Sequence, residues 1–395
     1  MDNATSGHVD LSFREGVGPL LYVVLVSTFF FMARSAMSPL LLDVEEAFGV
    51  GHAQSSGLMV LFTVGYALTM FASGFASARL THRRLIPFAG VVAAVGTSVL
   101  AVASSMLMMR VGLFIFGAGF GLFAPTGINM ITTVIRREDW QRALAIHELS
   151  PHAGMILAPL LVAALRPVLP WRWVFAFLTA VFIISAIVFL LRVRAGAAYG
   201  RAPSPAAIAH LMAKPAFWLL IVFFALALSG TDGVYLLVPT FLITEAGIDP
   251  RTANAVFGVS RFMPVLSLSV AALLADRFGP RYTITVALVG SGLAVLLLGL
   301  TGGWLRILMV FVQPAVGAIF FPAGFAAVSS LLPAESRNVG ISMVLPISVV
   351  LGVGVLPAFV GYMGEVATFA QGFAILGAAT TVLGTTALLV RFYGD

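Results

Sequence analysis

The chain of 395 residues contains no cysteine, which excludes disulfide bonds and thiolate metal sites. Charged residues make up only 10% of it, whereas soluble globular domains carry roughly a quarter. A glycine-rich phosphate loop ending in Gly-Lys-Ser/Thr is also missing, which argues against ATP-driven work. The polar start leads directly into an apolar run without a signal-peptide cleavage site. We therefore expect no cofactor, no bound metal and no catalytic constellation of an enzyme.

Long apolar runs dominate what is present, because 60% of the residues are hydrophobic. Runs of about 20 such residues are long enough to cross a bilayer as a helix. Irregular backbone or open sheet cannot face lipid. The sequence thus predicts an all-α membrane protein with twelve transmembrane helices, over residues 17–42, 54–78, 84–104, 107–132, 142–165, 171–192, 215–242, 252–275, 282–301, 304–330, 338–361 and 367–390.

The basic residues are distributed unevenly between the two predicted sides of the membrane. Of the 22 Lys and Arg residues, fifteen fall on one side, three on the other and four within spans. The positive-inside rule then predicts a multi-pass protein of the inner (cytoplasmic) membrane with both termini in the cytoplasm. The net charge of +6 follows from this topology, so we expect the lipid bilayer and no nucleic acid as a partner, and a monomer.

An internal repeat relates the two halves of the chain. The stretch from Gly74 to Arg84 overlays residues 272–282 at a shift of 198 positions. The same shift places Arg34 on Asp232 and Gly49 on Gly247. A second match, at a shift of 197, joins residues 123–127 to residues 320–324. We predict two pseudo-symmetric six-helix bundles, at 17–194 and 215–391, with a cytoplasmic tail at 1–16 and a cytoplasmic linker at 195–214.

The repeated loop motif resembles that of the major facilitator superfamily, in which it lies between spans two and three and between spans eight and nine. The first copy departs from the family pattern by having Ala78 in place of the acid and Thr81 in place of the second glycine. The resemblance implies a conformational latch between neighbouring helix ends, formed by Gly74, Arg79 and Arg83 in the first copy and Asp276, Arg277, Gly279 and Arg281 in the second.

Three charges are predicted near the middle of the membrane. A charge at that depth costs about 2.5–3.5 kcal/mol on insertion scales, so Arg34, Asp232 and Arg261 are functional candidates. Guanidinium groups suit carboxylates, and Arg261 resembles an arginine of the monocarboxylate carriers. We therefore predict Arg34 and Arg261 as substrate-binding, joined by the less specific candidates Tyr66, Tyr235 and Gln313, and Asp232 as the proton-coupling carboxylate.

Each of these candidates also has a structural interpretation. Arg34 and Asp232 could form a salt bridge that only holds the halves together, and Arg261 could be structural. On predicted span five, His147 and Glu148, with His152 nearby, could form a proton relay. The alternative, which we favour there, is a polar network at the inner end of the helix.

The sequence therefore predicts a secondary active transporter that works by alternating access. We expect it to move a small organic anion of the carboxylate type, which arginine side chains would bind. Protons would move with the anion in symport. The alternative function is a proton-driven multidrug or metabolite exporter, which would need an apolar cavity and could use Asp232 alone.

Overall fold

The structure is a computed structural model, which describes residues 11–136, 139, 143, 146–147, 149–193, 209, 212–331 and 337–389. Within these ranges the regular secondary structure is helical apart from one bridge between Leu11 and Ile135, and short turns connect the helices. Ten helices of this part are long and apolar enough to cross a membrane. Of the twelve predicted spans, the fifth appears only from residue 149, as a shorter apolar helix, and the eighth is interrupted.

The chain divides by its internal contacts into two compact units. Unit 1 comprises Met1–Ala36 and Leu61–Pro203, and unit 2 comprises Met37–Val60 and Ser204–Asp395. The helices of unit 1 are α1 (Phe13–Ser35), most of α4 (Leu58–Arg79), α5 (His82–Ala101), α6 (Met106–Val134), α8 (Leu149–Leu165) and α9 (Arg172–Arg192).

Unit 2 contains the helices of the second half of the chain. They are α11 (Pro215–Leu228), the π-helix η2 (Ser229–Gly233), the 3-10 helix η3 (Val234–Leu237), α12 (Val238–Thr244), α13 (Pro250–Ser260), α14 (Met263–Leu300), α15 (Gly303–Ala318), α16 (Phe320–Leu331), α17 (Arg337–Val349), the π-helix η5 (Val350–Val355), α18 (Leu356–Val366), α19 (Phe369–Thr385) and the 3-10 helix η6 (Thr386–Leu389).

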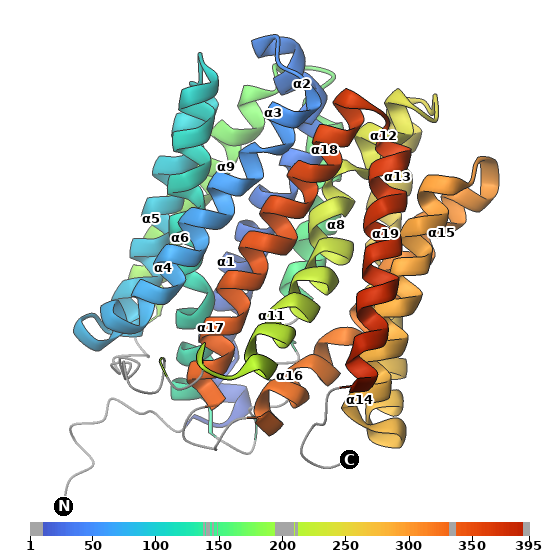
Figure 1. Cartoon of the computed structure of the whole chain (residues 1–395). Coiled ribbons are helices and arrows are strands. Elements are labelled where there is room, and N and C mark those ends of the chain that lie inside the picture. The colour runs from blue at the N-terminus through green and yellow to red at the C-terminus, as the bar shows by residue number, and fades with distance from the viewer. Residues whose placement is uncertain are drawn as a thin grey trace, which may run out of the picture. The chain divides into compact units, whose positions relative to one another are not determined.

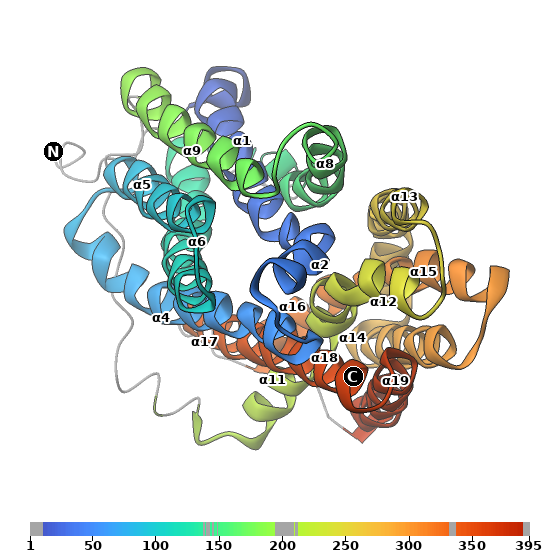
Figure 2. The same cartoon turned by 90° about the horizontal axis from the view of Figure 1, so that it is seen from above.

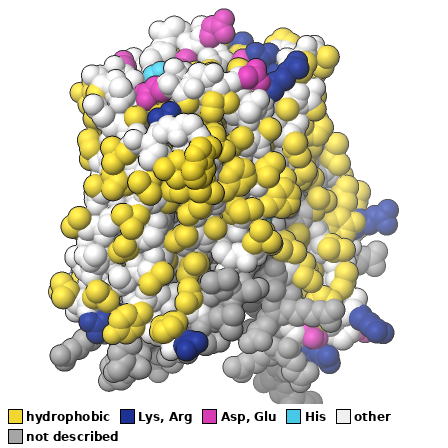
Figure 3. All heavy atoms as spheres, turned by 90° about the vertical axis from the view of Figure 1, so that its right-hand side faces the viewer, with side chains coloured by type: hydrophobic (Ala, Val, Ile, Leu, Met, Phe, Trp, Pro, Cys, Tyr) yellow, Lys and Arg dark blue, Asp and Glu magenta, His cyan; other side chains and the backbone are white. Residues whose placement is uncertain are grey.

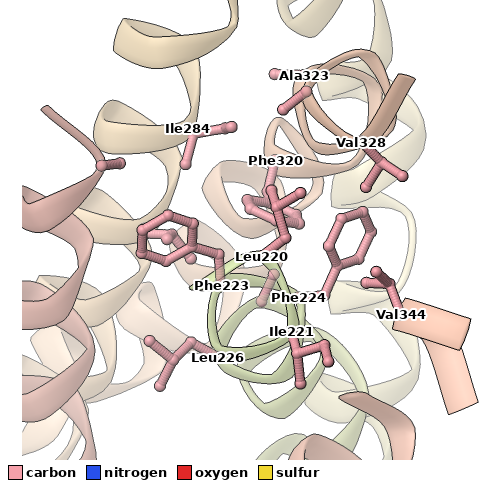
Figure 4. Close-up of a cluster of buried hydrophobic side chains, with 14 of the residues drawn as sticks. Leu220, Ile221, Phe223, Phe224, Leu226, Ile284, Phe320, Ala323, Val328 and Val344 are labelled. Atoms are coloured by element: carbon pink, nitrogen blue, oxygen red, sulfur yellow. The ribbon is translucent and has the colours of Figure 1, made fainter. Parts of the chain in front are cut away.

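Aromatic side chains fill the core of unit 2. The rings of Phe224 and Phe320 meet edge to face at 4.9 Å, and Val328 and Val344 lie beside them (Figure 4). All four residues are at most 1% exposed. Burial of such side chains contributes about 1.5–3 kcal/mol each, so this cluster fixes α11 against α16 and α17.

Residues 37–60 belong to unit 2, although they precede most of unit 1 in the chain. This segment carries α2 (Met37–Phe48) and α3 (His52–Ser56). Helix α3 packs against α18 (Figure 1), and α2 packs against α12 (Figure 2). The predicted bundle boundaries follow chain order and so include residues 37–60 in the first bundle. The contacts of the structure assign this segment to unit 2.

The repeat is visible in the backbone as well as in the sequence. Gly49 and Gly247, which match at the shift of 198, have φ angles of 61° and 65°. Both lie in the left-handed region that only glycine enters at little cost. In the second match, the ring of Phe123 packs against Gly127 and that of Phe320 against Gly324, one helical turn later in each case. Equivalent local packing at equivalent positions supports the predicted pseudo-symmetry of the two halves.

The surface over α14, α15 and α19 has the distribution expected of a membrane protein. Figure 3 shows apolar side chains across the middle of this face, with most of the visible Lys, Arg, Asp and Glu near its two ends. Large apolar side chains of α14 such as Leu266, Val286 and Leu297 are exposed. An exposed apolar band of this kind is typical of a surface that faces lipid or another protein, which agrees with the span prediction.

Candidate functional site

Asp232 lies in an interruption of the predicted seventh span. The segment Ser229-Gly-Thr-Asp-Gly233 forms the π-helix η2, and the 3-10 helix η3 follows it. Two glycines within five residues weaken α-helical geometry. Single-turn π-helices of this kind occur often at functional sites. Asp232 is partly exposed, so the local fold presents its carboxylate from an irregular turn, and its predicted role stays a prediction.

Arg261 is a buried residue that fastens this irregular turn. It lies between α13 and α14 with only 4% of its surface exposed. Its Nη1 donates a hydrogen bond of 2.6 Å to the carbonyl oxygen of Thr231, directly before Asp232. Its guanidinium lies 4.0 Å from the ring centroid of Tyr235 and 4.6 Å from that of Phe257. These contacts give Arg261 a structural task within unit 2, and its predicted substrate contact remains untested.

Tyr235 and Gln313 are also buried inside unit 2. The Tyr235 hydroxyl is hydrogen-bonded to Ser260 at 3.0 Å and to the carbonyl of Val310. Gln313 is fully buried and donates to the Ser291 hydroxyl at 2.9 Å. Both side chains join neighbouring helices around η2. In this conformation they serve packing, and a role in binding substrate stays a prediction.

A second π-helix packs directly against the first. Helix η5 (Val350–Val355) divides the predicted eleventh span and contacts η2. A Cβ atom on Gly233 would collide with the carbonyl oxygen of Gly352, and one on Gly352 would collide with that of Ala225. Small residues permit such close backbone approach between membrane helices. Asp232 is therefore carried by one of two irregular turns that are in backbone contact.

In unit 1, Arg34 lies at the end of a row of three aromatic side chains. Its guanidinium lies 5.2 Å from the ring centroid of Phe31. The Phe31 ring meets that of Phe120 edge to face at 5.0 Å, and Phe120 meets Tyr66 in the same way at 5.4 Å. Arg34, Phe31 and Tyr66 are partly exposed. The structure thus connects two predicted site residues, Arg34 and Tyr66, through two intervening rings.

Sequence analysis missed the two phenylalanines that connect them. With 32 phenylalanines in the chain, composition does not distinguish two of them. The spacing was a usable signal for Phe31, because residues three apart share one face of a helix. Phe120, from α6, had no such signal, because its contact with α1 is tertiary.

The cluster on predicted span five is only partly described. His147 is 6% exposed, and the Ser150 hydroxyl donates to its carbonyl oxygen at 2.6 Å. The hydroxyl oxygens of Ser150 and Ser27 are 2.7 Å apart and connect α8 with α1. Glu148 lies outside the described residues, and His152 is partly exposed. These contacts connect the helix end through Ser150 and the His147 backbone, and both interpretations of the His147 and His152 side chains stay predictions.

The first copy of the loop motif connects helix ends within unit 1. Arg83 Nε donates to the carbonyl oxygen of Val193, the C-cap of α9, at 2.8 Å. Cations suit the carboxyl ends of helices, where carbonyl groups are exposed. Arg79 is exposed and Gly74 partly so. The predicted latch thus has one defined contact in this copy, made by Arg83.

The second copy forms a sharp turn within α14. Gly279 has φ 74° and ψ 170°, where α14 bends between the predicted spans eight and nine. Arg277 is exposed, with its guanidinium 5.5 Å from the Phe278 ring centroid, and Arg281 lies 6.0 Å from that of Tyr282. The side chain of Asp276 lies outside the described ones. In the first copy, Thr81 stands at the position of Gly279 with φ −64°, so the two turns differ in geometry.

Known proteins resemble the whole chain in sequence and in fold. The family model described as Major Facilitator Superfamily matches residues 23–263 and 229–394. The chain is 22% identical over 384 residues to the "Putative multidrug resistance protein MdtD" of Escherichia coli O81 (strain ED1a) and of Shigella flexneri, which covers 82% of each chain.

Solved transporter structures share the fold. A bacterial homologue of the human lysosomal transporter Spinster, in an inward-facing and unoccupied conformation, gives a TM-score of 0.81 at 18% identity over 96% of both chains. A POT family transporter in complex with 5-aminolevulinic acid gives 0.80 at 14% identity, over 97% of this chain and 98% of that one. The chain therefore belongs to the Major Facilitator Superfamily and is a multi-pass membrane transporter, not an enzyme.

Proposed function

We propose that the protein is a proton-coupled secondary transporter of small organic anions with an apolar or aromatic body. The row formed by Arg34, Phe31, Phe120 and Tyr66 carries this proposal. It combines one permanent positive charge with three rings on unit 1. A guanidinium pairs with a carboxylate in a planar, bidentate manner, and the adjacent rings suit the edges and faces of an aromatic body.

Asp232 is proposed as the coupling carboxylate. It is partly exposed and lies in the π-helix η2, whose position is fastened by Arg261 through the Thr231 carbonyl. Burial favours the neutral form of a carboxyl group and a nearby arginine favours the charged form. Binding and release of a proton by this carboxyl group during alternating access would couple transport to a proton gradient.

In the proposed orientation the protein lies in the inner (cytoplasmic) membrane, and both termini are in the cytoplasm. It is supported by the excess of basic residues on one side, fifteen against three. The turns that follow α2 and α12, at Gly49 and Gly247, then lie on the outer side.

A second candidate function is proton-driven export of lipophilic compounds. The curated relatives are named as putative multidrug resistance proteins, and three rings at the site would also bind uncharged aromatic cargo. Arg34 discriminates between the two candidates, because an uncharged or cationic compound gains nothing from a guanidinium beside the rings.

Uptake of radiolabelled benzoate into proteoliposomes with an acidified exterior tests the proposal. Parent protein should accumulate benzoate above empty liposomes. We expect Arg34→Gln to raise KM by about tenfold or more, which corresponds to the loss of about 1.4 kcal/mol or more. Asp232→Asn should leave a slow uptake that no longer responds to the pH gradient.

Two matched substitutions serve as controls for this assay. Arg110→Gln removes an exposed arginine of α6, and Asp249→Asn removes an exposed carboxylate at the start of α13. Both should retain parent kinetics. An unchanged KM in Arg34→Gln would refute the anion site. Extrusion of a neutral lipophilic dye that is indifferent to Arg34→Gln would establish the exporter instead.

A further inference from the structure

The contact between residues 37–60 and the second half of the chain is one that would break when the transporter changes conformation. The segment is connected at both ends to unit 1, through Ala36 and Leu61, yet it packs within unit 2. The Ser38 hydroxyl donates to the carbonyl oxygen of Leu236 at 2.5 Å. Ser56 of α3 packs directly against Gly361 of α18. Movement of unit 1 against unit 2 would therefore pull this segment from its partners.

His52 lies at the centre of this contact. Its Nδ1 is 2.9 Å from Oε1 of Glu45, so it pairs the start of α3 with the end of α2. The Ser55 hydroxyl donates to the same carboxylate oxygen at 2.5 Å. The His52 side chain is 26% exposed and that of Glu45 11%. Glu45 is thus held in place, while the imidazole stays within reach of solvent protons.

The second half of the chain contributes two further carboxylates and a ring. Glu365 of α18 accepts a hydrogen bond of 3.1 Å from the backbone N–H of Ala53. Glu245, which follows α12, accepts from the N–H groups of Phe369 and Ala370 and so fixes the start of α19. The Phe369 ring lies 4.9 Å from the His52 ring. His52 therefore touches the corner between α18 and α19 directly.

The charges around His52 all have the same sign. Glu45 from α2, Glu365 from α18 and Glu245 from the end of α12 are the groups that act on it electrostatically. With a neutral imidazole, the contact contains three carboxylates and no positive charge among these groups. A proton bound at Nε2, while Nδ1–H is donated to Glu45, gives an imidazolium that attracts all three. Histidine is the side chain whose charge changes near neutral pH.

We propose that His52 is a second proton-binding site, separate from Asp232, which holds residues 37–60 against α18 and α19 when it is protonated. The inference uses the alternating access and orientation of the proposed function, and is independent of the cargo. In that orientation His52 takes its proton from the outer solution. An acidic exterior then favours closure of the outer end, and loss of the proton favours its opening.

Distances between two spin labels test this proposal on the whole protein in lipid nanodiscs. Because the chain has no cysteine, Ala47→Cys on α2 and Gly302→Cys between α14 and α15 can be labelled directly. Ala47 is exposed, and a Cβ on Gly302 meets nothing within 4 Å. Between about pH 5.5 and about pH 8, we expect the ratio of the shorter to the longer distance to fall by about fivefold.

Two substitutions of His52 have opposite expected effects. His52→Arg keeps a positive charge at every pH and should hold the shorter distance throughout. His52→Gln removes the charge and should favour the longer distance throughout. Asp249→Asn, an exposed outer-end carboxylate outside the group of three, is the control and should keep the parent pH response. Because the two variants move the equilibrium in opposite directions, general misfolding cannot imitate the expected result.

The outcomes are decisive in both directions. A parent protein without pH response, or a His52→Gln variant that retains it, overturns the proposal. Failure of benzoate uptake alone would refute the proposed cargo and leave the distance measurement unaffected. A pH response that is lost in Asp232→Asn and retained in His52→Gln would assign the proton site to Asp232.

Discussion

The Ser38 hydroxyl and the Leu236 carbonyl oxygen are hydrogen-bonded at 2.5 Å, and the two residues are 198 positions apart. This is the shift of the internal repeat, so equivalent positions of the two halves touch each other. Contacts between equivalent positions occur near a pseudo-two-fold axis. Arg34 and Asp232 precede these two residues by four positions each. The match between the two charges is thus a match in sequence, in the same register as this contact.

Ser38→Ala should weaken the contact without unfolding the protein. It removes one buried hydrogen bond, worth about 1 kcal/mol, from the association of residues 37–60 with η3. We expect the distance between labels at positions 47 and 302 to shift toward the longer value at every pH. Ser98→Ala is the control, because the Ser98 hydroxyl bonds only to a carbonyl of its own helix, α5. A Ser38→Ala variant with the parent distribution would contradict this role.

Gly233→Ala and Gly352→Ala should both destabilise unit 2. A Cβ at Gly233 would collide with the carbonyl oxygen of Gly352 in η5, and one at Gly352 would collide with that of Ala225 in α11. Forced overpacking of this kind costs about 1–3 kcal/mol, which thermal unfolding in detergent can measure. Gly18→Ala, with nothing within 4 Å of its Cβ position, should be neutral or raise the unfolding temperature. Equal unfolding temperatures in all three variants would be inconsistent with the packing described.

Arg261→Lys separates a positioning role from contact with substrate. Lysine keeps the charge but loses the planar group that lies against Tyr235 and Phe257 and donates to Thr231. We expect a loss of about 1–3 kcal/mol of stability, a lower kcat, a changed pH dependence of transport and a nearly unchanged KM. Arg110→Lys, at an exposed arginine, is the control. A raised KM with parent stability would instead favour direct contact with the anion.

Much of the fold follows from the sequence because lipid imposes strong constraints. Hydropathy predicts the spans, and the turn glycines Gly49 and Gly247 occur where the repeat places them, since positive φ angles select glycine. The pairing of residues 37–60 with α18 was not predictable in this way. The pairing depends on which conformation the transporter adopts. The sequence of an apolar helix such as α18 also has no periodic pattern from which its packing partner could be predicted.

The candidate site was predictable in its charges and not in their surroundings. A charge within an apolar run is conspicuous, so Arg34, Asp232 and Arg261 could be identified as candidates from the sequence alone. The π-helix that carries Asp232 results from two glycines together with packing against η5. The aromatic surroundings of Arg261 come from Tyr235 and Phe257, whose rings meet it only once the helices are assembled.

The two copies of the loop motif should respond differently to equivalent substitutions. Gly279 has φ 74° and ψ 170°, a region that is accessible essentially only to glycine, and a side chain there costs about 1–3 kcal/mol. Thr81, at the matching position, has φ −64° and ψ 152° as the N-cap of α5, a conformation that any residue adopts. Gly279→Ala should thus lower the unfolding temperature and the transport rate, while Thr81→Ala should lower neither by more than a small amount.

Thr81→Gly completes this comparison, because it restores the residue that the family motif has at this position. If the first turn needed glycine, the variant would be more stable and more active than the parent. From the angles of Thr81 we expect the reverse, a loss of a few tenths of a kcal/mol through added freedom of the unfolded chain. Parallel unfolding and uptake measurements on the three variants decide the matter. A gain in Thr81→Gly would mean that the first turn changes conformation during transport.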